Sequence, residues 1–337
     1  MGRPGVRTMG KNKVSLVTTI LNEEKTLPEF IDSLLAQTRR PEEVIVVDGG
    51  SKDRTFEILK SYADRVGNLT VIQSRGANIS RGRNLAIAEA TSDLIVVTDV
   101  GCQLHPRWLE AISRPLQEGS AQVVAGLSQP DARSFLEKCL AAVNVPLVEE
   151  IEEERFMPSS RCIAFRKRVW EEVGGYPEWL DIGEDMNFNF KLKRMGYSIQ
   201  LVREAVVYWR MRETLREIFR QFFGYARGDA MAGMYPQRHL IRFTTYLGLL
   251  VALSLSLSPR FPYLPLLLIP LALIYLSKPL RRSVRVFQED RLGMIFSWLA
   301  MPFLMLYLDL AKMAGYVNGL LKRPRMRSLK RKMRSKI

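Results

Sequence analysis

The sequence is poor in the residues that build disulfide frameworks and metal clusters. Its 337 residues include three cysteines, Cys102, Cys139 and Cys162, which lie far apart and form no CxxC pair. This pattern favours small buried side chains in a reducing compartment over disulfides or a cysteine zinc site. The two histidines, His105 and His239, also lack the spacing of metal ligands. We therefore expect neither residue type to carry the chemistry.

A glycine-rich turn is missing after the first strand-like segment. Residues 14–21 are apolar and β-branched, and the NEEKTL sequence that continues the chain contains no glycine. A dinucleotide-binding fold places GxGxxG at this turn, and a P-loop needs GxxxxGK followed by Ser or Thr. The absence argues against nicotinamide and flavin enzymes and against P-loop enzymes. It also disfavours sugar-nucleotide pyrophosphorylases, which need a comparable loop.

Acidic residues are outnumbered by basic ones, and the formal net charge is +15. Such a charge suggests an anionic partner, which can be a nucleic acid, a phosphate-bearing substrate or an anionic membrane surface. From Leu321 onward the chain reads LKRPRMRSLKRKMRSKI and contains no acid. The first 12 residues are also basic, and no apolar segment of the kind found in secretory signals follows them.

Residues 13–210 alternate between strand-like and helix-like patterns. Apolar strand-like runs occupy residues 14–21, 44–47, 69–72 and 94–98, and helix-like runs occupy residues 27–37, 56–66 and 83–90. The alternation predicts an α/β fold with a mostly parallel sheet and helices on both faces. Ligands of such sheets bind at the carboxyl ends of the strands, where Asp48 and Asp99 fall.

Three apolar stretches follow, at residues 243–258, 261–277 and 292–317. A bilayer-spanning helix needs about 20 apolar residues. The first two stretches are separated by a proline-rich turn and predict a transmembrane hairpin, with a pair of buried core helices as the alternative. The third carries Asp309 and Lys312 and has basic segments on both sides, so the positive-inside rule does not decide whether it spans, re-enters or lies at the interface.

Charged side chains at the expected strand ends are the candidates for nucleotide binding. Asp48 precedes two glycines, so its carboxylate can accept hydrogen bonds from a base or ribose, or can simply shape the turn. Arg75, Arg81 and Arg83 surround a helix N-terminus, where they can meet phosphate oxygens or form surface charge. Asp99 follows a buried strand and can bind a cation that bridges a diphosphate, or can cap the strand.

A pair of acids, Glu184 and Asp185, begins a later helix-like segment. An acid at this position is stabilised by the helix dipole, so helix capping is the ordinary explanation. The functional explanation is a general base that takes a proton from an acceptor hydroxyl.

A set of motifs, taken in order, resembles glycosyltransferase family 2: ILNEE, VVDGGSKDRT, RGRNLA, TDVG, GGYPEWLDIGED with MGY after it, and RQFFGYARG. The resemblance covers about residues 13–230. It implies a GT-A fold, in which a nucleotide-binding α/β sheet is joined to an acceptor-binding half. It also implies an inverting mechanism.

The resemblance implies roles for individual residues. Asp99 stands at the first Asp of the family's DxD motif and would hold Mg²⁺ or Mn²⁺. Asp185, with Glu184 beside it, matches the base of the family's ED motif. The residues implied to contact the nucleotide are Thr19, Asn22, Glu23, Asp48, Arg83 and Asn84.

Two departures from the family pattern affect these expectations. Gly101 replaces the second Asp of DxD, which removes one carboxylate from the metal site. Processive synthases carry QxxRW, but FFGY follows Gln221 here, which argues against a processive enzyme. Arg220, Gln221 and Arg227 are instead expected to grip an acceptor phosphate.

The sequence thus predicts a membrane-anchored hexosyltransferase. We expect a nucleotide-diphosphate sugar as donor and a lipid-linked or glycan acceptor, in polysaccharide or glycolipid and glycoprotein glycan synthesis. The alternatives are a polyprenyl-phosphate sugar synthase, a nucleotidyltransferase that releases pyrophosphate, and an inactive membrane scaffold. The basic tail follows the membrane segments, so membrane lipids are favoured over nucleic acid as its partner.

The predicted organisation has four parts. A basic flexible N-terminus at residues 1–12 precedes a GT-A domain at residues 13–232. Transmembrane or interfacial helices at residues 233–317 are followed by a basic cytosolic tail at residues 318–337. The expected location is the cell membrane, with several spans and a cytosolic catalytic domain.

Overall fold

The structure, a computed structural model, describes residues 13–334. The predicted flexible N-terminus at residues 1–12 and the end of the predicted tail, residues 335–337, lie outside the described residues. The chain divides into two compact units. The sheet unit comprises the described residues of Met1–Asp131 together with Ile151–Arg210, and the helical unit comprises Ala132–Glu150 and the described residues of Met211–Ile337.

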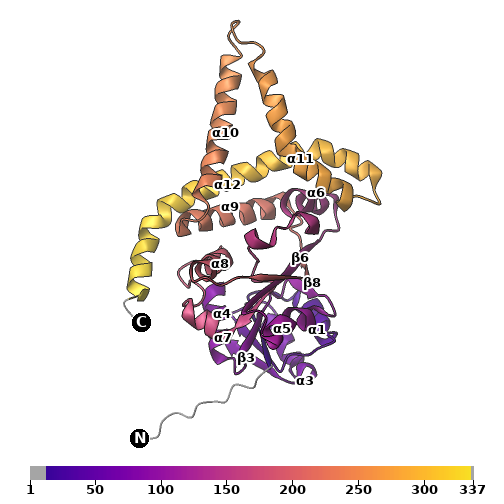
Figure 1. Ribbon diagram of the computed structural model, residues 1–337, viewed down its shortest axis with the longest axis vertical. Helices are drawn as coiled ribbons and strands as arrows, with labels where there is room; N and C mark the ends of the chain where they lie inside the picture. The colour runs from indigo at the N-terminus through magenta and orange to yellow at the C-terminus, as the bar shows by residue number, and fades with distance from the viewer. Residues whose placement is uncertain (1–12, 335–337) are drawn as a thin grey trace. The chain divides into compact units, whose positions relative to one another are not determined.

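The sheet unit is built on one eight-stranded sheet in the order β3-β2-β1-β4-β7-β6-β8-β5. Strands β3, β6 and β8 of this sheet are labelled in Figure 1. Its first half is parallel and consists of β1 (Val14–Ile20), β2 (Glu43–Asp48), β3 (Leu69–Gln73) and β4 (Leu94–Val97). Strands β1, β2 and β4 are short runs of mostly buried, apolar and largely β-branched residues, as expected for strands that are covered on both faces, whereas the edge strand β3 is partly exposed. Their carboxyl ends meet at one edge, where Asp48 and Asp99 lie.

The second half of the sheet is mixed. It contains β5 (Cys102–Leu104), β6 (Val123–Asp131), β7 (Ile163–Arg166) and β8 (Gln200–Arg210). Strand β7 runs antiparallel to both β4 and β6, whereas β6 and β8 are parallel. The short β5 forms the edge and pairs antiparallel with β8.

Helices cover both faces of this sheet. They are α1 (Leu27–Leu35), α2 (Thr55–Ser61), α3 (Ala63–Val66), α4 (Ile79–Glu89), α5 (Trp108–Glu118), α7 (Lys167–Glu172) and α8 (Glu184–Arg194), with the short 3-10 helix η2 (Glu153–Arg155). On one face Val17, Ile95 and Phe165 share a buried core with residues of α4 and α8. Their strand neighbours face the other side, and α5 packs on β4, β6, β7 and β8. The predicted α/β fold with a largely parallel sheet is confirmed.

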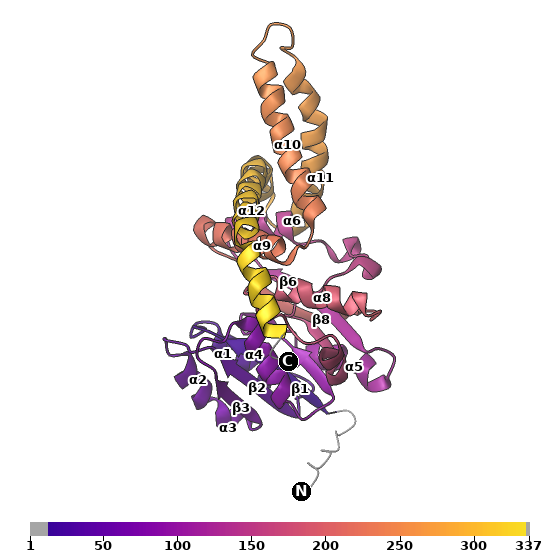
Figure 2. The same cartoon turned by 90° about the vertical axis from the view of Figure 1, so that its left-hand side faces the viewer.

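The helical unit contains α6 (Phe135–Asn144), α9 (Leu215–Ala232), α10 (Pro236–Leu255), α11 (Leu268–Val286) and α12 (Arg291–Arg334), with the 3-10 helices η1 (Val148–Glu150) and η3 (Leu264–Leu267). Helix α9 begins with a capping box between Thr214 and Glu217. It packs closely on α12, because a Cβ at Gly315 would lie 2.1 Å from the Phe223 carbonyl oxygen. Figure 2 shows α10 and α11 as the two long helices joined by a loop.

One helix in the described part of the chain, Arg291–Arg323 within α12, is long and apolar enough to cross a membrane. This is the stretch that the sequence left undecided. The predicted hairpin helices do not meet the same test, so several spans are not supported. These two helices fall short because charged residues lie within them. Arg238 and Arg242 lie in the first half of α10, and Lys278 and several arginines lie in the second half of α11.

Candidate active site

Arg83 joins two acids at the strand ends of the sheet unit. Its side chain is buried, with 2% of its surface exposed. Its Nη2 donates to Asp99 Oδ1 at 2.6 Å, and its Nη1 donates to Glu184 Oε1 at 2.7 Å. These residues belong to α4, to the turn after β4 and to the first turn of α8. The fold therefore brings together three of the residues singled out in the sequence, and we call Arg83, Asp99, Glu184 and the adjacent Asp185 the acid-rich cluster.

Helix α4 is placed by its cap and by one glycine. The Asn78 side chain accepts a hydrogen bond from the Arg81 backbone N–H at 2.9 Å and fixes the start of the helix. A Cβ at Gly82 would lie 2.6 Å from Thr19 Cγ2, so glycine lets α4 rest directly on β1. Thr19, a predicted nucleotide-pocket residue, is thus half-buried under α4, and Arg83, the residue after Gly82, reaches Asp99 and Glu184.

Arg161 also reaches this cluster, although no motif in the sequence marked it. Strands β4 and β7 pair antiparallel with Val97 opposite Ile163, so the residues two positions beyond, Asp99 and Arg161, face each other. The Arg161 Nε lies 3.7 Å from Asp99 Oδ2, and its guanidinium lies 4.5 Å from the Trp209 ring centroid. The sequence shows only that Arg161 is a basic residue just before a strand. The pairing of β4 with β7 is what places it opposite Asp99.

The two adjacent acids at the start of α8 occupy different environments. Glu184 is buried and paired with Arg83, whereas Asp185 is half-buried and accepts a hydrogen bond from the Met186 N–H at 2.7 Å. Burial and the charge of Asp185 raise the pKa of Glu184 to about 7, although Arg83 acts in the opposite direction. The pair therefore combines a buried acid, Glu184, whose pKa lies near neutrality, with the more exposed Asp185.

Asp48 ends β2 with a fully buried side chain. Its Oδ1 accepts hydrogen bonds from the Ser51 N–H at 2.9 Å and the Ser51 hydroxyl at 2.6 Å, and its Oδ2 accepts one from Gln73 at 3.1 Å. Burial alone would raise the pKa of Asp48, but these hydrogen bonds outweigh it and lower the pKa. The carboxylate therefore both shapes the turn and stays ionised.

Asn22 and Glu23 tie the loop after β1 to the loop after β2. Asn22 has a left-handed backbone with φ of 57°, and its side-chain oxygen accepts a hydrogen bond from the Lys52 N–H at 2.8 Å. The Glu23 N–H donates to Thr55 Oγ1 at 2.7 Å. These contacts place both residues in the loop that lies against the turn after Asp48.

The Asn84 amide braces a neighbouring loop. It donates to the Tyr176 carbonyl at 2.9 Å and to Glu178 at 3.0 Å, and it accepts from Trp170 at 3.0 Å and from the Tyr176 N–H at 2.9 Å. These bonds account for the donors and acceptors of the amide. Its geometry is that of a side chain holding the 170–178 segment in place behind Arg83.

The predicted acceptor residues, Arg220, Gln221 and Arg227, lie on α9 in the helical unit. The Gln221 amide donates to the Tyr225 hydroxyl at 2.9 Å. The acid-rich cluster lies entirely in the sheet unit.

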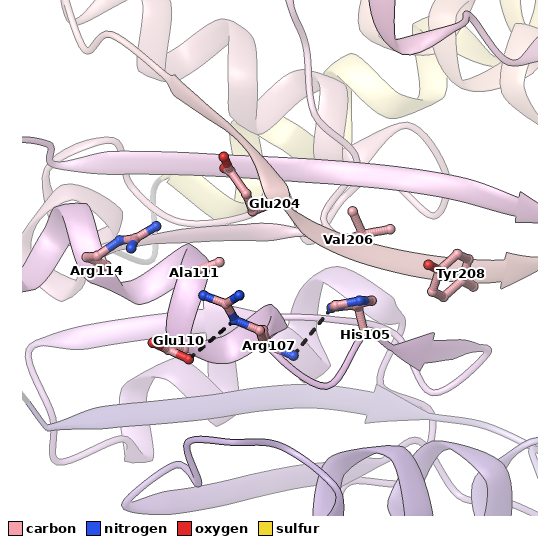
Figure 3. Close-up of a pocket in the computed structure, with 8 residues that line it drawn as sticks. All are labelled: His105, Arg107, Glu110, Ala111, Arg114, Glu204, Val206 and Tyr208. Atoms are coloured by element: carbon pink, nitrogen blue, oxygen red, sulfur yellow. Dashed lines mark hydrogen bonds and ion pairs between the residues drawn. The ribbon is translucent and has the colours of Figure 1, made fainter.

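A separate hollow of about 300 Å³ in the sheet unit lies between α5 and β8 (Figure 3). Its polar lining includes His105, Arg107, Glu110 and Glu204, and Arg107 pairs with Glu110 at 3.9 Å. None of the predicted site residues lines it.

The residues around Asp99 do not fit a bound divalent metal. Mg²⁺ and Mn²⁺ take oxygen ligands, commonly from carboxylates. The Asp99 oxygens face the guanidiniums of Arg83 and Arg161 instead, and Gly101 supplies no side chain. Within residues 13–334, no group of three or more His, Cys, Asp or Glu side chains is placed to hold a metal. Two cations on one carboxylate compete with a metal for the same oxygens, so the predicted role of Asp99 as metal ligand does not match its surroundings.

Comparison with known proteins identifies two family models along the chain. The model described as Glycosyl transferase family 2 matches residues 15–138. The model described as Glycosyl transferase family group 2 matches residues 95–311, which is more than half of the chain. The two matches overlap across the strand end that carries Asp99.

Individual relatives are distant in sequence. Glycosyltransferase AglE of Haloferax volcanii is 24% identical, over 80% of this chain and 86% of that protein. O-antigen chain rhamnosyltransferase RfbN of Salmonella typhimurium is 27% identical, over 63% of this chain and 70% of that protein. Among solved structures, S. aureus TarS 1-349 in complex with UDP is similar with a TM-score of 0.48 and 17% identity, over 93% of this chain and 91% of that chain.

Proposed function

The chain belongs to glycosyl transferase family group 2, and from that premise we propose that it moves a sugar from a nucleotide-diphosphate sugar to a lipid-linked or glycan acceptor at the cytosolic face of a membrane. It is a glycosyltransferase with a GT-A-like fold. The name of RfbN refers to O-antigen chain synthesis, which supports a role for this chain in building a polysaccharide or a related surface glycan.

The acid-rich cluster is the observation that carries this proposal. Asp185 stands at the α8 N-terminus beside the buried Arg83–Glu184 pair. In the proposed reaction its carboxylate takes the proton of the acceptor hydroxyl, whose oxygen attacks the anomeric carbon. The bond to the diphosphate breaks on the opposite side, so the nucleoside diphosphate leaves and the configuration is inverted. Glu184 and Arg83 hold the geometry of this step.

The nucleotide would bind along the loops after β1 and β2. Asp48 is kept ionised by its hydrogen bonds, and its buried carboxylate shapes the turn against which a base or a ribose would lie. Asn22 and Glu23 fix the neighbouring loop. Thr19 lies beneath α4, and Asn84 holds the loop behind Arg83. Enzymes of this family generally use a divalent metal, but we assign no step to one because the surroundings of Asp99 do not fit it.

The helical unit supports membrane attachment through its exposed apolar side chains. Large examples on α10, α11 and α12 are Leu247, Leu250, Leu271, Ile274, Leu299 and Phe303. An exposed apolar surface of this kind favours contact with lipid. Basic residues both precede and follow the candidate span, so the positive-inside rule favours the cytosolic face for each of these flanks.

The predicted domains and acceptor contacts remain part of this proposal. Residues 13–232 would act together as the catalytic domain, with Arg220, Gln221 and Arg227 of α9 contacting an acceptor phosphate. This assignment favours a lipid phosphate acceptor and keeps the polyprenyl-phosphate sugar synthase as the second candidate. Its specific support is the density of arginine on α9.

The test is a screen of nucleotide sugars with the full chain in detergent and lipid extract as acceptor. We expect release of a nucleoside diphosphate with one donor, and a loss of about 10²- to 10⁴-fold in turnover for Asp185→Asn with unchanged folding. The matched control is Asp64→Asn, which changes an exposed acid on α3 and should retain activity.

Other outcomes of the screen identify the alternatives. Near wild-type turnover in Asp185→Asn would exclude the general-base role. Release of pyrophosphate would identify a nucleotidyltransferase, and failure to bind any sugar nucleotide would identify a scaffold.

A further inference from the structure

We propose that Arg161 supplies the positive charge that binds the donor diphosphate, so that nucleotide binding by this chain does not require a divalent metal. The inference rests on the proposed function, because it assumes a nucleoside diphosphate at the strand ends. It assigns the diphosphate to a residue that no sequence motif identifies.

Arg83 is unsuited to this task because its charge is already used inside the protein. Both of its Nη atoms donate to acids, and its side chain is 2% exposed. Asp99 and Glu184 hold the guanidinium charged, and the pKa of Arg83 is raised although burial opposes this. Arg83 is therefore a positioning residue that fixes Asp99 and Glu184.

Arg161 has the properties that a diphosphate contact needs. Its side chain is 24% exposed, and its Nε lies 3.7 Å from Asp99, a longer and more solvated pair than Arg83 makes. The guanidinium carbon of Arg161 lies over the Trp209 ring, 4.5 Å from its centroid, as in a cation–π contact. This contact holds the guanidinium in place, and guanidinium N–H groups are suited to hydrogen-bond phosphate oxygens.

The turn after β4 provides the space. A Cβ built on Gly101 meets no atom within 4 Å, so the position opens onto free volume. Cys102, the next residue, pairs with Trp209 across β5 and β8, which places the Arg161–Trp209 stack beside this turn. Glycine removes an acid that would repel a diphosphate, and arginine adds a cation that attracts it.

Glycine at position 101 and arginine at position 161 both make the site less negative than a DxD site would be. A metal-binding DxD site needs a second carboxylate and no cation competing for the first. This site has lost that carboxylate at Gly101 and has two arginines at Asp99. A guanidinium can neutralise phosphate charge through paired hydrogen bonds, which is the contribution that the ion would otherwise make.

The experiment measures binding of UDP and of GDP to the full chain in detergent by calorimetry, in EDTA and in excess Mn²⁺. We expect dissociation constants that agree within about threefold between the two conditions, because RT ln 3 is small beside a charge-assisted hydrogen bond. Arg161→Ala should weaken binding about 10- to 100-fold in both conditions. Arg161→Lys should fall between wild type and Arg161→Ala, because lysine keeps the charge but loses the paired geometry.

Two further variants sharpen the measurement. Arg168→Ala removes an exposed arginine of α7 that contacts Gln122, and it should bind as wild type does. Gly101→Asp has room for its side chain, and the added acid should weaken binding in EDTA because it repels the diphosphate. Circular dichroism of each variant shows whether it folds.

The outcomes separate this inference from the proposed function. Wild-type binding that is lost in EDTA and restored by Mn²⁺ would overturn the inference and leave the nucleotide-sugar function standing. Wild-type affinity in a folded Arg161→Ala variant would do the same. If no nucleotide binds in either condition, the proposed function fails and the inference fails with it.

Discussion

Each unit of the molecule contains a buried acid paired with an arginine, but the balance of charges differs. In the acid-rich cluster, one arginine, Arg83, serves both Asp99 and Glu184. In the helical unit one acid, Asp309, accepts hydrogen bonds from Arg242 Nε at 2.8 Å, from Tyr246 at 3.1 Å and from Tyr275. We call Asp309 and these partners the donor-rich cluster.

The donor-rich cluster is extended by His239. The Nε2 atom of His239 lies 3.0 Å from Asp229 Oδ2, and its Nδ1 lies 3.1 Å from Arg242 Nη1. Its ring stacks on Tyr316 with centroids 3.9 Å apart. The network therefore links α9, α10, α11 and α12 through polar side chains that satisfy one another.

The difference between the clusters separates structure from chemistry. A carboxylate with several donors has its charge balanced within the fold and serves to hold helices together. A cluster with more acids than fixed cations keeps negative charge and an acid that titrates near neutrality, which general acid–base catalysis requires. On this argument the proposed reaction would take place at the acid-rich cluster, whereas the donor-rich cluster holds helices together.

The largest expected contrast is between Arg83→Ala and Arg242→Ala. Removing Arg83 leaves Asp99 and Glu184 without their shared counter-ion, and we expect a loss of about 3–5 kcal/mol in the free energy of unfolding. Removing Arg242 leaves Asp309 with its tyrosine donors, so the loss should be about 1–3 kcal/mol. Denaturant titration of both variants measures the difference. An equal or larger loss for Arg242→Ala would show that the two clusters do not differ in this way.

The pH dependence of stability gives a second, somewhat smaller contrast. The pKa of Glu184 is raised from 4.5 to about 7, so the folded protein keeps a proton that the unfolded chain releases between these values. Stability from this group is complete below pH 4.5 and is lost as pH rises through 7. The loss amounts to about 3 kcal/mol, and Glu184→Gln should abolish it.

Glu150 of the helical unit should show the opposite sign. Burial raises its pKa, but the Leu147 N–H and Arg282 outweigh burial and lower it. Its contribution is therefore present above the ordinary pKa and is lost as the pH falls below it. Unfolding of wild type, Glu184→Gln and Glu150→Gln, compared at acidic and neutral pH, checks both signs. If the free energy of unfolding of Glu184→Gln depended on pH as that of the wild type does, Glu184 would not be the group that titrates.

The parallel half of the sheet was predictable because its signals are local. Strand β1 begins at Val14 and β4 at Leu94, as their apolar runs indicate. The helix expected at residues 56–66 begins at Thr55 and is broken at Tyr62 into α2 and α3. The mixed half was not predictable in this way. Strands β5 to β8 pair across long sequence separations, and no local pattern encodes which strand lies beside which.

The site follows the same division. Asp99 and Asp185 could be singled out from motifs that each occupy a few residues. The pairing of Arg83 with Glu184 joins positions 101 residues apart, and the approach of Arg161 to Asp99 depends on the antiparallel register of β7. The several predicted spans are not supported for a related reason: α10 and α11 extend beyond the apolar runs into segments that carry charged residues.

The smallest expected effects come from the tyrosines of the donor-rich cluster, and they test its defining property. Tyr246 and Tyr275 both donate to Asp309 Oδ2, so either one alone still satisfies that oxygen. Tyr246→Phe or Tyr275→Phe should therefore cost only about 1 kcal/mol in the free energy of unfolding, with turnover per folded molecule unchanged. The double variant takes both tyrosine donors from a buried carboxylate oxygen, so its cost should exceed the sum of the single costs.

The double-variant measurement is informative in either direction. A cost above the sum means that the donors of Asp309 substitute for each other, as expected for a carboxylate whose charge is balanced inside the fold. Strict additivity means that each tyrosine acts independently and that water replaces whichever is removed. In that case Asp309 is solvated like a surface acid, and its difference from the acid-rich cluster would rest on solvent exposure instead of on the ratio of donors to acids.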